Sequence, residues 1–208
     1  MTIQNQLYKD IIWFINNKND ISCSYLQNEY LNSIAWMWTE YHTIHDDQIK
    51  RGKYISRYWS EKALTEICNE LGVPSIVESY CNRNEIIDLR IPITKGNRNP
   101  KLIAEHVITK KLFVDTIKAM QCDSIPEDFE KILLNRYFSC IITKGEANSL
   151  GNKKYPDSGM RLYDPGFDCW ARYKLHNKSA KETINVFECS VGFSDQDNCW
   201  MVSILLKN

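Results

Sequence analysis

Glu105 and His106 are adjacent in the segment LIAEHVITKKL, which covers residues 102–112. A carboxylate is a ligand that hard divalent ions accept, and an imidazole exchanges protons near neutral pH. The pair could therefore supply one metal ligand and one general base to a hydrolytic site. The same two residues could also be ordinary polar side chains at a strand edge. Most of the functional interpretation depends on which description holds.

The segments around this pair alternate between strand and helix patterns. We expect strands at residues 102–108 and 138–143, because both are short apolar runs flanked by polar residues. Two helices, over residues 110–120 and 124–137, are expected in the connection between them. The second of these begins with a capping-box pattern, S-I-P-E. Residues 144–150 can form a further helix directly after the second strand.

The rest of the chain predicts helices first and strands later. Helical spacing of apolar residues occurs in the first seventy residues, over 7–15, 24–47 and 60–72. The third pattern has a start signal, Ser60, and a stop signal, Gly72. Near the C-terminus, residues 184–193 and 199–207 flank the turn sequence SDQDN, which is typical of a β-hairpin. These patterns predict an α+β fold with a helical N-terminal half.

Composition limits the functional classes. The 208 residues carry 26 basic and 26 acidic side chains, so the net charge is zero and neither indicates nor excludes nucleic acid as a partner. None of the eight cysteines forms a C-x-x-C pair, so we expect no structural zinc. The N-terminus lacks a signal-peptide pattern, and no run approaches the length of a membrane span. We therefore expect a cytoplasmic protein with reduced thiols and no membrane partner.

The order of strand, connection, strand and helix resembles the HNH, or ββα-metal, endonucleases. Their first motif is an acidic residue followed by histidine and two aliphatic residues, which is EHVI at 105–108. Their second motif is an asparagine in the helix after the second strand, and the segment ITKGEANSLGNKK places Asn148 there. Asn148 lies 42 residues after His106, so a helical insertion must fill the connection. Asn152 or Lys153 would occupy the third motif position.

This resemblance implies a ββα-metal type core with a helical insertion and a C-terminal β-hairpin. It implies catalytic roles for His106, Asn148 and Lys153, and metal ligands at Glu105, Asn148 and Asn152. One Mg²⁺ or Mn²⁺ ion would serve each active site. Residues 1–94 are expected to form a mainly helical recognition or dimerisation part. Residues 95–175 would form the nuclease core, and residues 176–208 a β segment packed on that core.

The expected substrate is double-stranded DNA, as for a restriction or phage-defence enzyme. Because one active site cuts one strand, double-strand cleavage would require a homodimer. Basic residues near the motifs and in an aromatic-rich stretch are candidate nucleic-acid contacts, although lysine on a loop is most often solvated surface. These candidates are Lys110, Lys111, Lys144, Lys154, Arg51 and Arg57.

Other interpretations stay open. A nuclease toxin acting on DNA or RNA would use the same chemistry in a different context. A non-enzymatic module would bind protein or nucleic acid through the aromatic-rich N-terminal half. A second nuclease pattern, with carboxylates at Asp157 and Glu188, is weaker because Ser190 stands where that pattern has lysine. His42 and His45 are three residues apart on an expected helix, but no second ligand pair accompanies them.

Overall fold

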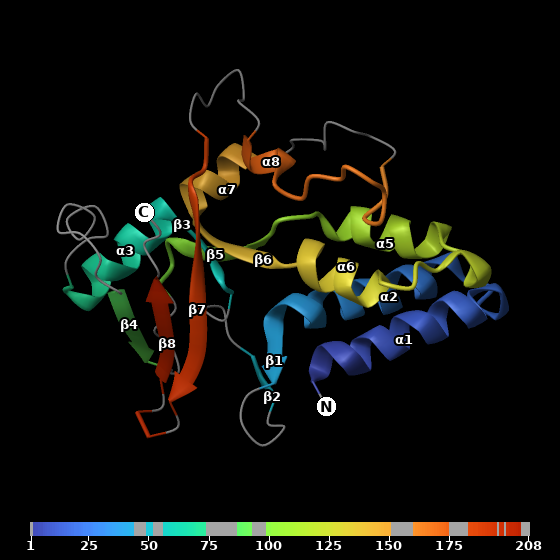
Figure 1. The fold of residues 1–208 in the computed structure, drawn as a ribbon, viewed down its shortest axis with the longest axis horizontal. Coiled ribbons are helices and arrows are strands. Elements are labelled where there is room, and N and C mark those ends of the chain that lie inside the picture. Colours follow the sequence, from blue (N-terminus) through green and yellow to red (C-terminus); the bar gives the residue numbers. More distant parts are fainter. Residues whose placement is uncertain are drawn as a thin grey trace. The chain divides into compact units, whose positions relative to one another are not determined.

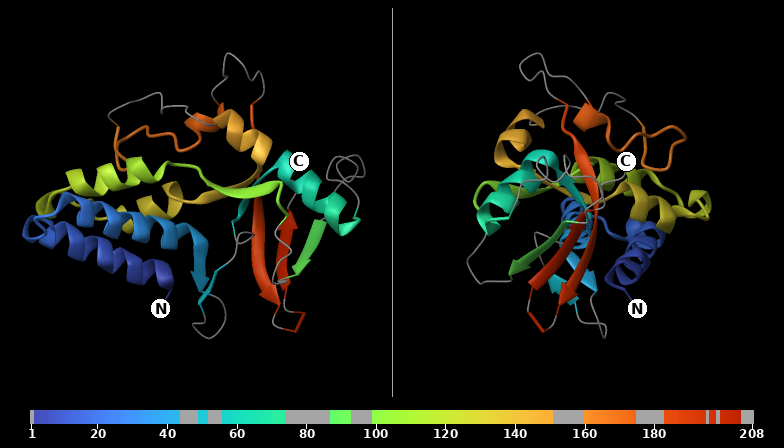
Figure 2. Two further views of the ribbon diagram at one scale, coloured as in Figure 1. Left: turned by 180° about the vertical axis from the view of Figure 1, so that it is seen from behind. Right: turned by 60° about the vertical axis from the view of Figure 1, so that its left-hand side comes forward.

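The chain folds into N-terminal helices and a six-stranded mixed sheet with further helices, an α+β architecture (Figures 1 and 2). The structure is a computed structural model, and it divides into two compact units, each built from three stretches of the chain. The helical unit comprises residues 1–52, 106–138 and 154–172, and the sheet unit comprises the remainder. The described residues are 2–43, 49–51, 56–73, 87–92, 99–150, 160–174, 183–194, 196–197 and 199–204.

The described part of the helical unit is built mainly from four α-helices. They are α1 (Ile3–Asn17), α2 (Ser24–Glu40), α5 (Lys110–Ala119) and α6 (Phe129–Arg136). The described part of this unit also contains two short 3₁₀ turns, η1 (Lys18–Asp20) and η4 (Cys122–Ser124), and an antiparallel pair of strands, β1 (Tyr41–Thr43) and β2 (Ile49–Arg51).

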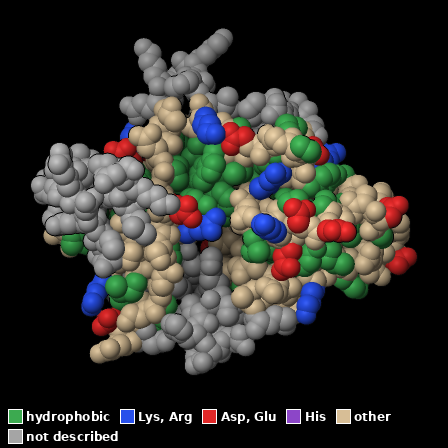
Figure 3. Space-filling view, in the orientation of Figure 1, with side chains coloured by type: hydrophobic (Ala, Val, Ile, Leu, Met, Phe, Trp, Pro, Cys, Tyr) green, Lys and Arg blue, Asp and Glu red, His purple; other side chains and the backbone are tan. Residues whose placement is uncertain are grey.

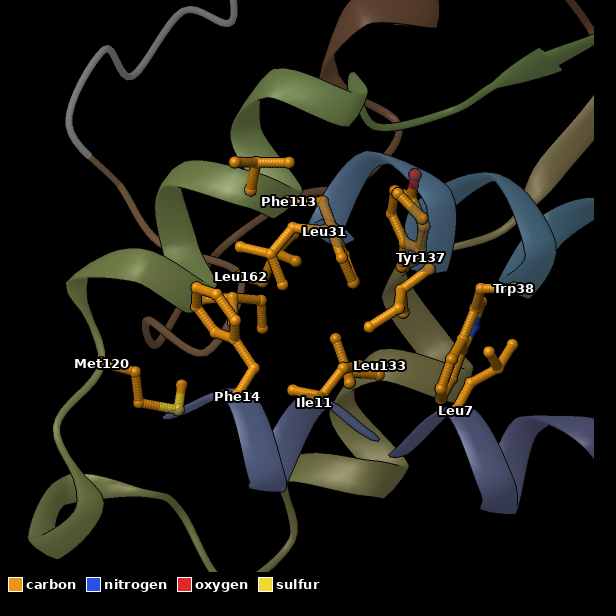
Figure 4. Close-up of a cluster of buried hydrophobic side chains, with 14 of the residues drawn as sticks. Leu7, Ile11, Phe14, Leu31, Trp38, Phe113, Met120, Leu133, Tyr137 and Leu162 are labelled. Atoms are coloured by element: carbon orange, nitrogen blue, oxygen red, sulfur yellow. The ribbon is translucent and has the colours of Figure 1, made fainter. Parts of the chain in front are cut away.

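Apolar side chains from all four helices point toward one another in the centre of this unit (Figure 4). Phe14 of α1, Leu31 of α2, Phe113 of α5 and Leu133 of α6 are all fully buried there. Removal of this apolar surface from water is the main force that holds the four helices together. The helical spacing of apolar residues in the sequence therefore reflects the packing of these helices against one another.

The sheet has the strand order β4-β8-β7-β3-β6-β5. The strands are β3 (Tyr58–Ser60), β4 (Ile87–Pro92), β5 (Leu102–His106), β6 (Ser139–Thr143), β7 (Val186–Ser194) and β8 (Cys199–Ile204). β3 runs parallel to β6, with Trp59 opposite Ile141, and antiparallel to β7. The helices that complete the described structure are α3 (Glu61–Leu71), α7 (Lys144–Leu150) and α8 (Ala171–Lys174).

Several predicted elements are confirmed. α3 begins after Ser60, whose hydroxyl accepts a hydrogen bond from the Ala63 amide, and ends at Gly72 with a φ of 67°. Glycine adopts that left-handed conformation without the steric cost of a Cβ atom, which explains the stop signal. β7 and β8 form the expected antiparallel hairpin, and α7 follows β6 directly.

Three expectations about local structure are wrong. The helix expected over residues 24–47 ends at Glu40, and His42 lies in a strand rather than on that helix. His45 lies outside the described residues. α6 begins at Phe129 rather than near Ser124, whose hydroxyl instead bonds to the backbone of Gln121, the residue that caps the start of η4. β3 interrupts the region expected to be helical, because its strand character comes from partners on both sides in the sheet.

The described cysteines are free thiols, and Cys140 and Cys189 are buried as expected. Across the described residues, no helix combines the length and the apolar character that crossing a membrane requires. On the face shown in Figure 3, basic and acidic side chains are interspersed rather than segregated. The three regions expected from the sequence remain a prediction about function.

Adjacent leucines on α6 allow a matched test of the helical core. Leu133 is completely buried and Leu134 is 45% exposed. We expect Leu133→Ala to lower the free energy of unfolding by about 2–5 kcal/mol, since it leaves a cavity among packed helices. We expect Leu134→Ala to change it by less than about 0.5 kcal/mol. Urea denaturation of both variants measures the difference, and equal effects would contradict this packing.

Candidate active site

β5, β6 and α7 form the strand–strand–helix order that the sequence predicted. β5 and β6 are neighbours in the sheet. Two backbone hydrogen bonds flank the pair, from Val107 N to Phe138 O at 3.1 Å and from Lys144 N to Lys101 O at 2.7 Å. The residue numbers of these bonds run in opposite directions, as in an antiparallel pair. The insertion between the strands contains α5 and α6.

His106 is the last residue of β5 and is partly buried. Its ring nitrogen Nε2 lies 2.9 Å from the hydroxyl Oγ1 of Thr39, near the end of α2. Its ring centroid lies 5.9 Å from that of Tyr137. The Arg172 guanidinium donates a hydrogen bond of 3.1 Å to the His106 backbone carbonyl. These contacts fix both the ring and the backbone of His106 within the helical unit.

Burial, the largest cause, and the nearby charges of Lys110 and Arg172 together lower the pKa of His106 from 6.5 to about 4. Burial disfavours the charged imidazolium because it removes water, and each cation adds like-charge repulsion. The imidazole is therefore neutral at physiological pH. A neutral imidazole has one unprotonated nitrogen, so His106 is in the form that can accept a proton.

The start of α7 is held by a buried carboxylate. Oε2 of Glu146 accepts hydrogen bonds from the backbone amide of Thr143, at 2.8 Å, and from its hydroxyl, at 3.0 Å. The Thr143 hydroxyl in turn accepts from the Glu146 amide at 3.2 Å. This is a reciprocal capping box, T-K-G-E, which satisfies amides that a helix start leaves unpaired.

The same carboxylate also reaches the start of α3. The Ser60 hydroxyl donates to Oε2 of Glu146 at 2.7 Å while it accepts from the Ala63 amide at 3.1 Å. Strands β3 and β6 are parallel neighbours, so the helices that follow them begin near each other. Two helix N-termini favour a negative charge nearby, because their exposed amides carry partial positive charge. Glu146 thus joins the starts of α3 and α7.

The predicted metal ligands Glu105 and Asn148 both belong to the sheet unit. Asn148 is exposed on α7, and Glu105 is partly buried on β5. The pKa of the Cys140 thiol on β6 is raised well above its usual value, first by burial and then by charges that include Glu146 and Glu105. The division between the two units falls between Glu105 and His106, so the predicted ligand and the predicted base belong to different units.

The chemistry of the donor set suits a hard divalent ion. Glu105 offers a carboxylate and Asn148 an amide oxygen, and Mg²⁺ or Mn²⁺ prefers such oxygen ligands and keeps several waters. Among the residues that the structure describes, no three His, Cys, Asp or Glu side chains gather into a metal cluster.

Some predicted site residues lie outside the described residues. These are Asn152, Lys153 and Lys154, together with Asp157 of the weaker nuclease pattern. Arg51 belongs to β2, but its side chain is also outside the description. The predicted third motif position and the nucleic-acid contacts predicted at Lys154 and Arg51 therefore stay predictions.

The described basic candidates differ in their surroundings. Lys110 and Lys144 are exposed at the first positions of α5 and α7. Lys111 forms an ion pair of 2.7 Å with Asp115, one turn along α5. The guanidinium of Arg57 lies 4.8 Å from the centre of the Tyr58 ring and 3.8 Å from the carboxylate of Glu188. Lys110 is the candidate whose charge acts directly on His106.

Sequence reasoning missed Thr39, Glu146 and Arg172. The T-x-x-E pattern of residues 143–146 is a local signal that could have identified Glu146 as a cap. Thr39 and Arg172 are 67 and 66 residues from His106, so no local pattern connects them to it. Only the folded chain brings these side chains to the imidazole.

No known protein family, curated protein or solved structure matches this chain.

Glu146 provides a test of the shared helix cap. We expect Glu146→Ala to lower the free energy of unfolding by about 2–4 kcal/mol, because buried donors on Ser60 and Thr143 lose their acceptor. Glu66→Ala is the matched control in the same unit, since Glu66 forms a surface ion pair of 2.6 Å with Lys101. Its effect should stay below about 1 kcal/mol. Urea denaturation measures the free energy of unfolding of both variants, and a Glu146→Ala variant as stable as the control would contradict the shared cap.

The pKa of His106 predicts a pH dependence of stability. The unfolded imidazole binds a proton below pH 6.5, whereas the folded one stays neutral down to about pH 4. The stabilisation is therefore complete above pH 6.5 and is lost as the pH falls toward 4, with a total on the order of 3 kcal/mol. His106→Gln removes this contribution and leaves the carboxylates unchanged. The free energies of unfolding of the wild type and His106→Gln, measured at several pH values, should converge as the pH falls from 6.5 to 4. Parallel pH profiles of the two proteins would rule out the lowered pKa of His106.

Proposed function

We propose that this chain is a metal-dependent endonuclease of HNH type that hydrolyses phosphodiester bonds in DNA. The observation that carries the proposal is the order β5, β6, α7, with a neutral imidazole at the end of the first strand and an exposed asparagine on the helix. This order and these residue types are the ones that the resemblance requires. The predicted context is that of a restriction or phage-defence enzyme.

Each residue has a defined chemical task in this proposal. His106 accepts a proton from the attacking water through its unprotonated ring nitrogen. Glu105 and Asn148 would hold one Mg²⁺ or Mn²⁺ ion, with Asn152 as a further ligand, and the bound ion would neutralise phosphate charge. Lys110, exposed at the start of α5, would attract a phosphate of the substrate. Lys153 would contact a second phosphate.

Double-stranded DNA is the proposed substrate, and a homodimer would be needed to cut both strands. A nuclease toxin with a DNA or RNA substrate is the alternative within the same chemistry. Genetic linkage to an immunity protein would favour the toxin, and linkage to a methyltransferase would favour restriction. A protein- or nucleic-acid-binding module without catalytic activity is the alternative to any nuclease.

Nicking of supercoiled plasmid tests the proposal. The purified full chain should relax the plasmid with Mg²⁺ or Mn²⁺ and not with EDTA. We expect His106→Gln to lower the rate by at least about 100-fold, the usual contribution of a general base. Asn148→Ala should lower it as well, by reducing affinity for the ion.

Asn135→Ala is the matched control for Asn148→Ala, since Asn135 is an exposed asparagine on α6. It should nick plasmid at the wild-type rate. Circular dichroism confirms that each variant is folded. Equal nicking by folded wild type and His106→Gln would remove His106 from the mechanism. Binding of DNA without cleavage under every metal tested would favour the non-enzymatic module.

A further inference from the structure

Thr39 contacts the His106 ring from the last turn of α2. The Thr39 side chain is buried, with 6% of the residue exposed. Its hydroxyl oxygen lies 2.9 Å from Nε2 of His106, 3.2 Å from the carbonyl oxygen of Trp36 and 3.4 Å from that of Ala35. The hydroxyl therefore has one imidazole nitrogen and two helix carbonyls within hydrogen-bonding distance.

The number of protons available in this contact determines which group donates and which accepts. A hydroxyl has a single proton to donate, and a carbonyl oxygen can only accept. If Thr39 donated to Nε2, its lone pairs would face the oxygen atoms of Trp36 and Ala35, which is repulsive. If Nε2 carries the proton, it donates to Thr39, and Thr39 donates to a helix carbonyl. Every polar atom in the contact is then satisfied, and the two bonds polarise each other.

The backbone of His106 is held independently of its ring. Arg172 donates to the His106 carbonyl at 3.1 Å, and the next two residues, Val107 and Ile108, are completely buried. The ring of Tyr137 lies beside the imidazole. Because the backbone is anchored in this way, loss of the Thr39 hydroxyl should change the protonation pattern of the ring more than its location.

We propose that Thr39 is a positioning residue that holds His106 in its Nε2–H tautomer and leaves Nδ1 as the proton-accepting nitrogen. The tautomer follows from the contact itself. Its catalytic consequence rests on the proposed nuclease function, in which Nδ1 would take the proton from water. Thr39 belongs to the N-terminal helices, so this region contributes directly to the imidazole as well as to the fold.

Nitrogen NMR of the full chain tests the tautomer directly. The protein is labelled with ¹⁵N-histidine, and the His106 signals among the four histidines are identified by their loss in His106→Gln. At neutral pH we expect Nε2 to be the protonated nitrogen and Nδ1 the unprotonated one. A dominant Nδ1–H form in the wild type would overturn the inference, and this measurement needs no variant at Thr39.

Two substitutions separate positioning from packing. Thr39→Val keeps the shape of the side chain and removes the hydroxyl, so the His106 signals should shift toward a tautomer mixture. Thr39→Ser keeps the hydroxyl and should restore the wild-type pattern. Plasmid nicking should fall by at least about tenfold in Thr39→Val and recover in Thr39→Ser, as for other groups that orient a catalytic imidazole.

The outcomes distinguish this inference from the proposed function. The Nε2–H tautomer in a chain that cuts no nucleic acid would support the role of Thr39 and contradict the nuclease. An unchanged tautomer in a folded Thr39→Val variant would contradict the role of Thr39, whether or not the chain cuts DNA.

Discussion

The carboxylate of Glu146 is the interaction on which the candidate catalytic helix depends. It accepts from Thr143 and Ser60, so the starts of α7 and α3 share one buried charge. An α-helix turns by about 100° per residue, so a residue two positions later lies on nearly the opposite side. Burial of Glu146 against the two helix starts therefore directs Asn148 toward solvent, where it is exposed. The cap sets which side of α7 is available for a ligand.

The imidazole is governed by a different balance of forces. Burial and two cations keep His106 neutral, which is the form in which an imidazole can accept a proton. The same depressed pKa makes the imidazole a weak proton acceptor, since basicity and pKa fall together. A water deprotonated by such a base must itself be unusually acidic, which is the chemistry that a bound divalent ion supplies. In a nuclease, a depressed histidine pKa and a metal requirement would therefore belong together.

The sequence predicted elements whose signals are local. Ser60 and Gly72 marked both ends of α3, and the apolar run before KGEANSL marked β6 and α7. It failed where the deciding partners are distant in the chain. The three-residue strand β3 exists because β6 and β7 pair with it on both sides. The surroundings of His106 were unpredictable for the same reason, since Thr39 and Arg172 reach it only through tertiary packing.

A structural and a catalytic histidine make different demands on the two ring nitrogens. A histidine that only completes a core needs its polar atoms satisfied, and the Thr39 contact meets that need at Nε2 alone. A glutamine or a threonine could serve such a contact without bringing a titratable ring beside Lys110 and Arg172, which oppose its charge. Because Thr39 occupies Nε2, any chemical role of the imidazole must be exercised through Nδ1. The difference between the two descriptions of His106 therefore reduces to what that single nitrogen contacts.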